Sequence, residues 1–442
     1  MEIKTFHGGV HPAEHKELSK ESPLTQLLPK GELVYMTNQH IGKPASPVVK
    51  KGDHVLAGQI IAEAGGFVSA NIVSSVSGTV KAVEPRKNAS GGSAMAIVVE
   101  NDGAYTLAEG VGVECDTNSL TGQEILSKVQ KAGIVGMGGA GFPTHVKLTV
   151  KTPEKIDYVI ANGAECEPYI TCDDQLMRTK ASEIVEGMEY MLRLFHNAKG
   201  VVVVENNKPE ATAAMEQACQ GHDRVYVQPV KTKYPQGGER SLITVITGKH
   251  LKLGMLPADA GCVVDNVATI RAIYRAVCLN EPLMERTVTV SGDSVKETGN
   301  FFVKIGTLSS ELIAAVGGWK EGLEPTKILI GGPMMGVALQ SLEVPVCKNN
   351  NAITALSYDT VAESTTTACL RCGRCNRVCP LGLSPQLMQV AAQRKNYDRY
   401  EKRLYGLECI ACGCCTYVCP AKRPLMQLFK QTKAEIMATK KR

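Results

Sequence analysis

Apolar and polar positions follow different periods along the chain, and these divide it into regions. Short β-branched runs separated by glycine fill residues 48–85, which predicts a small β-sandwich. Continuous apolar runs at 157–163 and 200–208 predict buried strands, and apolar spacings of three and four predict an amphipathic helix over 181–195. Helices and strands mixed in this way over about 110–280 indicate an α/β domain.

A second module and two irregular segments complete the pattern. Residues 286–318 predict two strands, a Gly-Asn turn at 299–300 and one helix, an arrangement similar to the soluble-ligand-binding β-grasp family. Residues 347–368 are polar and rich in threonine, so we expect a linker there. Residues 1–25 lack a clear period, and we expect an ordered docking arm.

Three histidines of this arm, His7, His11 and His15, recur every four residues. On a helix this spacing would align them as metal ligands. The intervening glycines and proline oppose helical geometry, so we favour docking over metal binding.

Composition and charge narrow the class of protein. A chain of 442 residues with 44% hydrophobic content predicts several globular domains. No apolar run reaches the roughly 18 residues of a membrane span, and the N-terminus lacks the apolar core of a secretory signal, so we expect a cytosolic chain. The net charge is +5 overall, but Cys369–Arg442 carries +11. We expect this surplus to offset a negatively charged metal group, and we expect no nucleic acid partner.

The cysteines give the strongest chemical signal. Nine of the sixteen fall between residues 369 and 419, and in a reducing compartment we interpret them as metal ligands. Residues 369–380 and 409–420 each read C-x2-C-x2-C-x3-C-P, the ferredoxin-type run for [4Fe–4S] clusters, whose fourth cysteine ligates the other cluster. We therefore predict one cluster on Cys369, Cys372, Cys375 and Cys419, and another on Cys409, Cys412, Cys415 and Cys379.

Structural zinc is the alternative for such cysteines. Zinc sites use ligand pairs and need no third cysteine in the run, so we favour two clusters that form an electron relay. Cys414 falls outside the spacing, and we expect it to be a bystander.

A glycine loop, "GMGGAGFPTHVK" at 136–147, matches the dinucleotide-binding spacing G-x-G-x-x-G. That fingerprint must follow a buried strand and open a helix. Here Thr121 and Glu124 form a capping box, helical spacing follows, and Gly133 suits a helix end. A helix therefore precedes the loop, and the Rossmann interpretation fails.

The loop instead resembles "G-R-G-G-A-G-F-P-T-G-x-K" of the FMN- and NADH-binding subunit of respiratory complex I. Three further segments, "NGAECEP" (162–168), "YPQGGERSLI" (234–243) and "DNVATI" (265–270), resemble that family in the same order. The chain is closer still to the C subunits of Rnf ion-translocating ferredoxin:NAD+ oxidoreductases. "FHGGVHPAEHK", "GGFVSANIVSSVSGTV", "YPQGGE" and the two ferredoxin runs extend this resemblance over essentially the whole chain.

The resemblance implies roles for individual residues. Gly136, Gly138, Gly139 and Gly141 would let backbone N–H groups approach the FMN phosphate and ring, and Lys147 would neutralise flavin charge.

Other residues would complete the flavin and nicotinamide site. Asn162, Glu165 and Glu167 would line the isoalloxazine and nicotinamide side, with the two glutamates as the candidate catalytic residues. Gly238, Glu239 and Asn266 would supply the remaining flavin contacts, and Phe142 would stack on a ring of NADH.

Some positions depart from the complex I pattern. Ala164 stands in place of Asp, Asp265 in place of the first Asn, Arg240 in place of the second Glu, and His145 in place of a loop Gly. These changes affect expected contacts to FMN.

Two other functions share some of these features. A soluble NADH-dependent cobalamin reductase would contain the same flavin core and paired clusters, and a flavin-free ferredoxin-like adaptor would contain the clusters alone. The N-terminal arm and β-sandwich favour the Rnf family. That family implies NAD(H) as substrate, FMN, two [4Fe–4S] clusters, integral membrane partner subunits, ferredoxin reached through the complex, and a peripheral position on the cytoplasmic face of the membrane.

The predicted fold is therefore multidomain α/β. We expect an arm (1–25), a biotinyl- and lipoyl-like β-sandwich of barrel-sandwich hybrid type (26–108) and an FMN/NADH-binding α/β domain (109–282). A β-grasp domain (283–346), a linker (347–366) and a helical two-cluster ferredoxin-type domain (367–442) follow.

Overall fold

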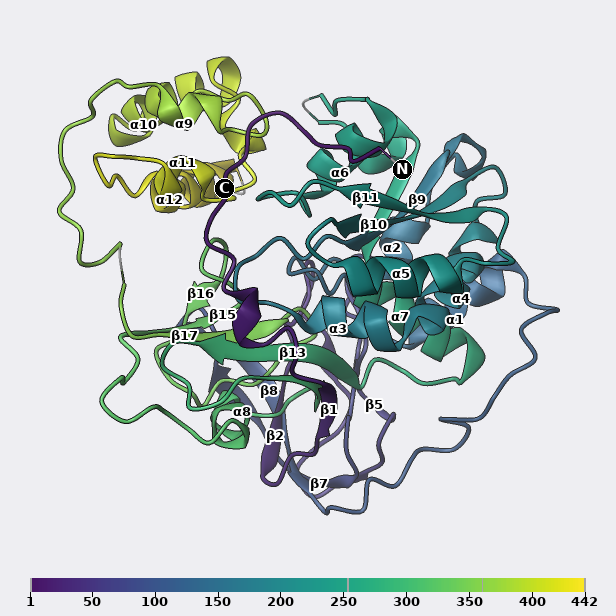
Figure 1. The fold of residues 1–442 in the computed structure, drawn as a ribbon. Helices are drawn as coiled ribbons and strands as arrows, with labels where there is room; N and C mark the ends of the chain where they lie inside the picture. The colour runs from purple at the N-terminus through teal and green to yellow at the C-terminus, as the bar shows by residue number, and fades with distance from the viewer. Residues whose placement is uncertain (1, 253, 360, 441–442) are drawn as a thin grey trace.

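The computed structural model describes residues 2–252, 254–359 and 361–440. A helical domain, coloured yellow-green in Figure 1, stands apart from a larger body of sheets and helices. The N-terminal segment runs between this helical domain and the body before it enters the body (Figure 1). The helical domain therefore meets the rest of the chain partly through residues from the other end of the sequence.

The predicted β-sandwich is confirmed. One sheet has the order β2-β8-β7-β4, and the other has the order β3-β5-β6. Their bounds are β2 (Glu32–Met36), β3 (Ser46–Pro47), β4 (His54–Val55), β5 (Ile60–Glu63), β6 (Ile72–Val73), β7 (Gly78–Lys87) and β8 (Ser93–Asn101). Apolar side chains from both sheets, among them Leu33, Ile61 and Ile97, form one buried core. The β-branched runs thus pack their alternate residues inward.

The α/β domain is built on a parallel sheet of order β11-β10-β9-β12. Its strands are β9 (Tyr158–Gly163), β10 (Lys199–Glu205), β11 (Val225–Val230) and β12 (Cys262–Asn266). Its helices are α1 (Gly122–Lys131), α2 (Thr144–Leu148), α3 (Cys172–Thr179), α4 (Ala181–Leu192), α5 (Pro209–Ala218), α6 (Glu239–Thr247) and α7 (Val267–Cys278), with 3₁₀ turns η2 (Pro153–Lys155) and η3 (Pro257–Ala260). The expected strands at 157–163 and 200–208 and the helix over 181–195 are confirmed, and helices cover both faces of the sheet because its strands are apolar on both.

A six-stranded sheet of order β1-β14-β13-β17-β15-β16 forms the β-grasp region. The strands are β1 (Leu24–Leu27), β13 (Glu285–Gly292), β14 (Gly299–Lys304), β15 (Lys327–Ile330), β16 (Val337–Ala338) and β17 (Ala352–Leu356), with helix α8 (Ser309–Ala315). β1 pairs in parallel with β14, so the end of the N-terminal arm supplies an edge strand of this sheet.

Two expectations for this region are wrong. Gly299 and Asn300 open β14 and form no turn, because the buried Asn300 amide donates to the carbonyls of Ser19 and Ser22, at 2.9 and 3.1 Å. The expected linker over 347–366 contains β17, which pairs with β13 on one side and β15 on the other. Its threonines suggested a loop, but Ile353 and Ala355 are buried in the β-grasp core.

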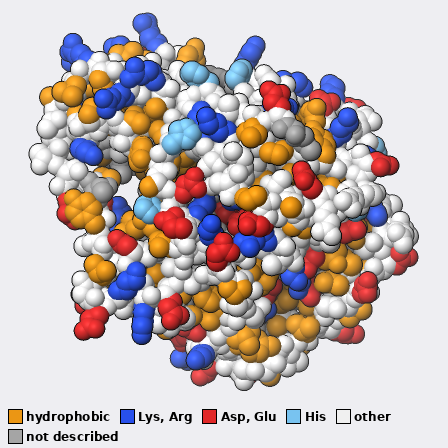
Figure 2. Space-filling model, viewed as in Figure 1, with side chains coloured by type: hydrophobic (Ala, Val, Ile, Leu, Met, Phe, Trp, Pro, Cys, Tyr) orange, Lys and Arg blue, Asp and Glu red, His pale blue; other side chains and the backbone are white. Residues whose placement is uncertain are grey.

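The helical domain consists of two similar halves. The first contains α9 (Arg374–Arg377) and α10 (Pro385–Gln393), and the second contains α11 (Cys414–Tyr417) and α12 (Leu425–Lys440). A π-helical turn η4 (Arg399–Arg403) and a 3₁₀ turn η5 (Gly406–Glu408) connect them, around a core that includes Met388, Tyr400 and Phe429. Figure 2 shows Lys and Arg side chains gathered over this domain, where the sequence has its charge surplus.

No helix within the described ranges combines the length and apolarity needed to cross a bilayer.

The β-sandwich, the α/β domain and the β-grasp region meet at one buried lysine. Lys348 is 1% exposed, and its ammonium donates to the carbonyls of Asn71 and Gly133, at 2.5 and 2.7 Å. Burial lowers its pKa from 10.5 to about 7. Between pH 7 and pH 10.5 Lys348 is protonated in the unfolded chain but largely neutral in the folded protein. Unfolding then takes up a proton, so the contribution of Lys348 to the free energy of unfolding rises as the pH is raised above about 7.

We therefore expect the parent protein to gain stability relative to Lys348→Met as the pH is raised from 7. Anaerobic denaturant unfolding, followed by circular dichroism at several pH values above 7, measures this difference. The exposed Lys51→Met variant serves as the control and should follow the parent at every pH. A Lys348→Met curve parallel to that of the parent would contradict the assignment.

Candidate functional site

The predicted flavin residues converge on the carboxyl edge of the parallel sheet. The chain leaves β9 toward β10 on one side, whereas β12 returns to the other side of β9. Ligands of open parallel sheets bind at such a switch point. Asn162 is the second-last residue of β9 and is in register with Asn266, the last residue of β12, so these two residues flank the switch point.

The glycine loop closes on itself beside this edge. The Gly136 N–H donates to the carbonyl of Phe142 at 2.8 Å, and the Gly141 N–H donates to that of Gly136 at 3.1 Å. Gly139 and Gly141 have φ of +111° and +68°, and a Cβ on Gly139 would meet nothing within 4 Å. Gly138 lies against Asn266, where a Cβ would be 3.4 Å from the Asn266 Cβ. The loop thus presents exposed backbone to an open space at the switch point.

The helix expected before the loop is confirmed. Thr121 and Glu124 make the predicted capping box at the start of α1, and Gly133 follows the helix end with φ of +65°. The loop then leads into α2, and the half-buried Phe142 lies two residues before the first residue of that helix. The loop therefore connects two helices, unlike a Rossmann fingerprint.

Lys147 is held at this edge by carboxylates. Its Nζ donates to the Val264 carbonyl at 2.6 Å and lies 3.3 Å from Asp265 and 3.5 Å from Glu239. Burial opposes the charge of Lys147, but Asp265 and then Glu239 outweigh it, so the pKa of Lys147 is raised. The side chain is a permanent cation next to α6, whose N-cap is Gly238.

The two asparagines organise the backbone around the switch point. Asn162 donates to the carbonyl of Gly237 at 2.9 Å, which ties the β9 turn to the 234–243 loop. Asn266 caps α7 by accepting the Ala268 N–H at 2.9 Å and donates to Asp173 at 2.7 Å. Asn266 also donates to the Asn162 carbonyl at 3.5 Å, so each amide links two of the segments that resemble the complex I family.

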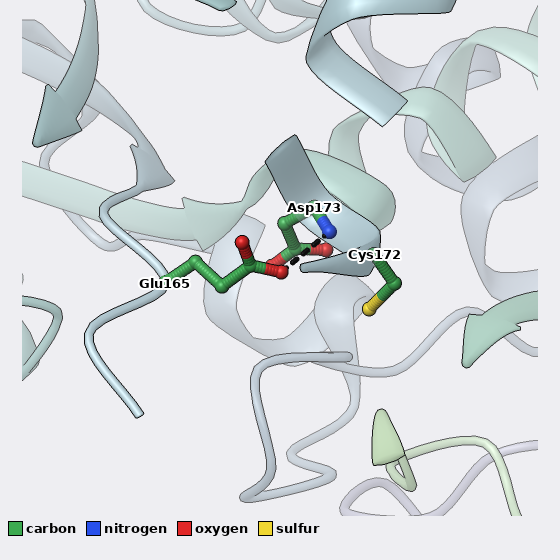
Figure 3. Close-up of side chains that lie close together, drawn as sticks. All are labelled: Glu165, Cys172 and Asp173. Atoms are coloured by element: carbon green, nitrogen blue, oxygen red, sulfur yellow. Dashed lines mark hydrogen bonds between the residues drawn. The ribbon is translucent and has the colours of Figure 1, made fainter. Parts of the chain in front are cut away.

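Glu165 turns toward the start of α3. Its carboxylate accepts the N–H groups of Asp173 and Asp174 at 2.6 and 3.3 Å, and Figure 3 shows it next to Asp173 and Cys172. Burial raises the pKa of Glu165 to about 8. Glu165, Cys172 and Asp173 are close enough to share a metal ion, but the carboxyl group of Glu165 already accepts two backbone N–H groups and lies 3.9 Å from the Lys16 ammonium.

Glu167 reaches the β-grasp region. Its carboxylate accepts the N–H groups of Met334 and Met335, at 3.1 and 2.8 Å, and burial raises its pKa to about 7. Both predicted catalytic glutamates thus use their carboxylates to hold backbone of this chain.

The sequence did not indicate two lysines that hold this turn. Buried Lys16, from the arm, donates to the carbonyls of Glu165, Glu167 and Ile170 at 2.8, 3.1 and 2.5 Å. Buried Lys208 donates to the Ala164 carbonyl at 2.8 Å and pairs with Glu205 at 3.2 Å. Neither belongs to a recognisable motif, although "ENNK" at the end of β10 places Lys208 at the correct edge.

Cysteines near the turn are packing residues. Cys166 accepts the Gly237 N–H at 3.3 Å, and burial raises its pKa to about 12. Burial also raises the pKa of Cys172. Raised pKa values of this kind disfavour the thiolate form on which cysteine reactivity depends.

The cluster cysteines gather in the crossed arrangement. One cavity is lined by three cysteines of the second run and the last of the first: Cys409, Cys412, Cys415 and Cys379. A second cavity is lined by the complementary set: Cys369, Cys372, Cys375 and Cys419. Cys414 also lines the first cavity, but its Sγ lies 3.8 Å from the Tyr234 carbonyl, to which it donates.

The backbones of the two runs are alike. Arg371 and Gly373 have φ of +55° and +72°, and the corresponding Ala411 and Gly413 have +53° and +81°. The N–H of residue 371 donates to Cys369 Sγ and that of residue 411 to Cys409 Sγ, each at 3.4 Å. N–H···S bonds of this kind stabilise thiolates bound to iron and tune cluster potentials, so both runs fit a [4Fe–4S] group.

Burial separates the two sets of ligands. Cys412 is 8% exposed, and burial raises the pKa of Cys409 to about 11, whereas Cys369 and Cys372 lie on the surface. The first cavity is therefore an internal site and the second an external one.

The internal cluster site borders the flavin loops. The buried Tyr234 donates to the Cys412 carbonyl at 2.8 Å, and Arg240 pairs with Glu408 at 2.5 Å. Tyr234, Cys412 and Met334 belong to one buried apolar cluster that Cys166 packs against. Arg240, which departs from the complex I pattern, thus serves the contact between the two domains.

The residues present fit a flavin. The open glycine cradle, the cation at Lys147 and the start of two helices supply donors for phosphate. The amide of buried Gln236, between Tyr234 and Gly237, has no hydrogen-bond partner in the parts of the chain that the structure describes. Buried polar atoms of this kind require a partner, which a bound ligand can supply.

Family models match the chain in four parts. A Nuo51 FMN-binding domain matches residues 129–275, and an RnfC barrel sandwich hybrid domain matches 4–104. An SLBB domain matches 287–338, and a 4Fe-4S dicluster domain matches 362–420. The NAD+-reducing [NiFe]-hydrogenase, in its air-oxidized state, has a similar fold, with a TM-score of 0.51 and 19% identity over 73% of this chain and 64% of that chain.

Relatives align along the whole length. The C subunit of the proton-translocating ferredoxin:NAD(+) oxidoreductase complex of Clostridium ljungdahlii is 42% identical, covering 100% of this chain and 96% of the relative. The Na(+)-translocating counterpart of Acetobacterium woodii is 40% identical over 100% of both. The C subunit of the ion-translocating oxidoreductase complex of Rhodobacter capsulatus is 43% identical, covering 86% of this chain and 73% of the relative. The chain therefore belongs to the family of C subunits of ion-translocating ferredoxin:NAD(+) oxidoreductase complexes.

Proposed function

We propose that this chain exchanges a hydride between NAD(H) and FMN at the carboxyl edge of its parallel sheet and relays single electrons through two [4Fe–4S] clusters. The observation that carries the proposal is the convergence at one edge of the glycine loop, Lys147, Asn162 and Asn266, next to the internal cluster site. FMN, when bound, supplies a ring that takes up electrons in a pair and releases them singly.

The residues of this chain bind and orient. The N–H groups of the glycine loop provide hydrogen-bond donors for the phosphate. The Lys147 side chain, whose pKa is raised, provides a cation. Asn162 and Asn266 hold the β9 turn, α7 and the 234–243 loop in register, with Gly238 and Glu239 at the start of α6. Phe142 supplies an aromatic face beside the loop.

Glu165 and Glu167 act in the proposal through the 163–170 turn. Hydride transfer requires orientation of two rings and no protein base, so carboxylates that fix this turn are sufficient. Their backbone hydrogen bonds support such a positioning role.

The proposal gives the two clusters an order. The site on Cys379, Cys409, Cys412 and Cys415 is internal and adjoins the flavin loops, so it exchanges electrons with them. The site on Cys369, Cys372, Cys375 and Cys419 has surface ligands and exchanges electrons with a partner. Basic residues around both offset the cluster charge.

Anaerobic titration with NADH tests the proposal. We expect bleaching of the flavin absorbance and reduction of both clusters, and we expect FMN in the supernatant after acid precipitation. Iron and sulfide without flavin, in a protein that NADH does not reduce, would identify a ferredoxin-like adaptor and overturn it.

We also propose that the chain is a peripheral subunit on the cytoplasmic face of a membrane complex, with integral membrane subunits as partners and ferredoxin reached through the complex. The names of the relatives place them in multi-subunit oxidoreductases that translocate ions. Affinity purification from solubilised membranes should recover this chain with membrane-spanning subunits. A soluble protein that reduces cobalamin on its own would contradict the assignment.

A further inference from the structure

The N-terminal arm crosses from the cluster domain to the flavin domain within a few residues. The N–H of Gly9 donates to the Val378 carbonyl at 2.9 Å, and Val378 precedes the cluster ligand Cys379. The next residue, Val10, exchanges two backbone hydrogen bonds with Tyr234, at 2.8 and 2.9 Å. Figure 1 shows this purple segment passing between the two domains.

The arm approaches both domains at backbone contact distance. A Cβ on Gly8 would lie 2.9 Å from the Cys379 carbonyl oxygen, and a Cβ on Gly9 would lie 2.6 Å from the Tyr234 carbonyl oxygen. Both glycines have positive φ, +80° and +77°. Only glycine fits such positions without displacing the neighbouring backbone. Val10 itself is 5% exposed and packs in the apolar cluster with Tyr234 and Cys412.

The same arm then holds the predicted nicotinamide-side turn. The carbonyl of Glu14 accepts the Tyr169 N–H at 2.8 Å, and the His15 ring stacks on Tyr169 with centroids 4.6 Å apart. Lys16 follows, with its three hydrogen bonds to turn carbonyls. Residues 8–16 therefore contact the cluster domain, the 234–243 loop and the 163–170 turn in sequence.

We propose that residues 8–16, which we call the strap, are a positioning element that fixes the separation between the flavin site and the internal cluster. The inference rests on the proposed function. Electron transfer over a gap falls steeply with distance. Among the described residues, the side-chain hydrogen bonds and ion pairs that cross this gap without the strap include Tyr234 with Cys412, Cys414 with the Tyr234 carbonyl, and Arg240 with Glu408. The strap adds backbone hydrogen bonds to both sides of this gap, to Val378 of the cluster domain and to Tyr234 of the flavin domain.

Gly8→Ala and Gly9→Ala test the strap in the holoprotein. In anaerobic stopped flow with NADH, we expect flavin bleaching at the parent rate and slower subsequent cluster reduction, by up to about a hundredfold for a misplacement of about 1 Å. The reduction potentials of both clusters should stay at the parent values. Hydrogen exchange should increase at Gly9, Val10 and Tyr234, which reports the contact without any turnover.

The control is Gly103→Ala. Gly103 has φ of +74°, but nothing lies within 4 Å of its added Cβ, so this variant introduces the same backbone strain away from the strap. It should leave both phases at the parent rates.

The outcomes separate the two proposals. A parent protein whose flavin and clusters ignore NADH would refute the proposed function. The positioning role of the strap would be refuted by a different result. In that case the parent shows both phases of reduction, and both strap variants reduce their clusters at the parent rate although hydrogen exchange at Tyr234 has increased. Slowing of the first phase as well would show that the arm shapes the flavin site and sets no separation.

Discussion

Cys379→Ala should lose the cluster that is built on the other cysteine run. Cys379 lines the internal cavity with Cys409, Cys412 and Cys415, although it lies more than twenty residues before them in the sequence. Removing a thiolate ligand leaves the cube with three, so we expect iron and sulfide to fall by about half. The cluster next to Cys379 in the sequence should keep its electron paramagnetic resonance signal.

Two companion variants make this result specific. Cys419→Ala should give the reciprocal loss, because Cys419 lines the external cavity with the first run. Cys414→Ala is the matched control, since Cys414 lines the same internal cavity as Cys379 but its thiol lies against the Tyr234 carbonyl. We expect both clusters to remain in that variant. Retention of the internal cluster in Cys379→Ala and its loss in Cys414→Ala would reverse the assignment.

Gly139→Val should remove FMN and spare the clusters. The φ of +111° at Gly139 strains any L side chain, which costs about 1–3 kcal/mol. The valine side chain would also occupy the open space beside the loop, where nothing lies within 4 Å of its Cβ. If the loop relaxes when no flavin is bound, this strain alone lowers the FMN affinity by roughly five- to 150-fold. The space that the side chain occupies adds to the loss. Flavin fluorescence after acid precipitation measures the FMN retained.

The matched control for this variant is Gly52→Val. Gly52 also has positive φ, +93°, with nothing within 4 Å of its Cβ, but it lies in a turn of the β-sandwich. It shares the strain and is remote from the cradle, so its FMN content should equal that of the parent. Full FMN content in Gly139→Val, with a normal folded signature, would show that the flavin lies elsewhere.

Much of the architecture was predictable because its signals are local. The capping box at Thr121 and Glu124, the apolar run of β10 and the cysteine spacing each depend on a few neighbouring residues. The crossed grouping of the cysteines around two cavities was also expected from the sequence, since two runs with this spacing constrain which thiolates can share a cube.

The predictions that were wrong concern segments whose partners are far away in the chain. β17 contains threonines that suggested a linker, yet it lies between β13 and β15, and such pairing depends on strands more than twenty residues distant. Gly299 and Asn300 suggested a turn, but the Asn300 amide is used by Ser19 and Ser22 of the arm. Local preference yields to tertiary pairing at these positions.

The sequence alone therefore determined the chemistry of this protein, because cysteine runs and glycine loops carry their function in short spacings. Only the tertiary structure decided how the two centres are held together. Lys16, Tyr234 and Arg240 acquire their roles from groups 149, 178 and 168 residues away, at distances set by packing of whole domains. A lysine in a docking arm looks like any solvated charge until the fold brings three carbonyl oxygens to it.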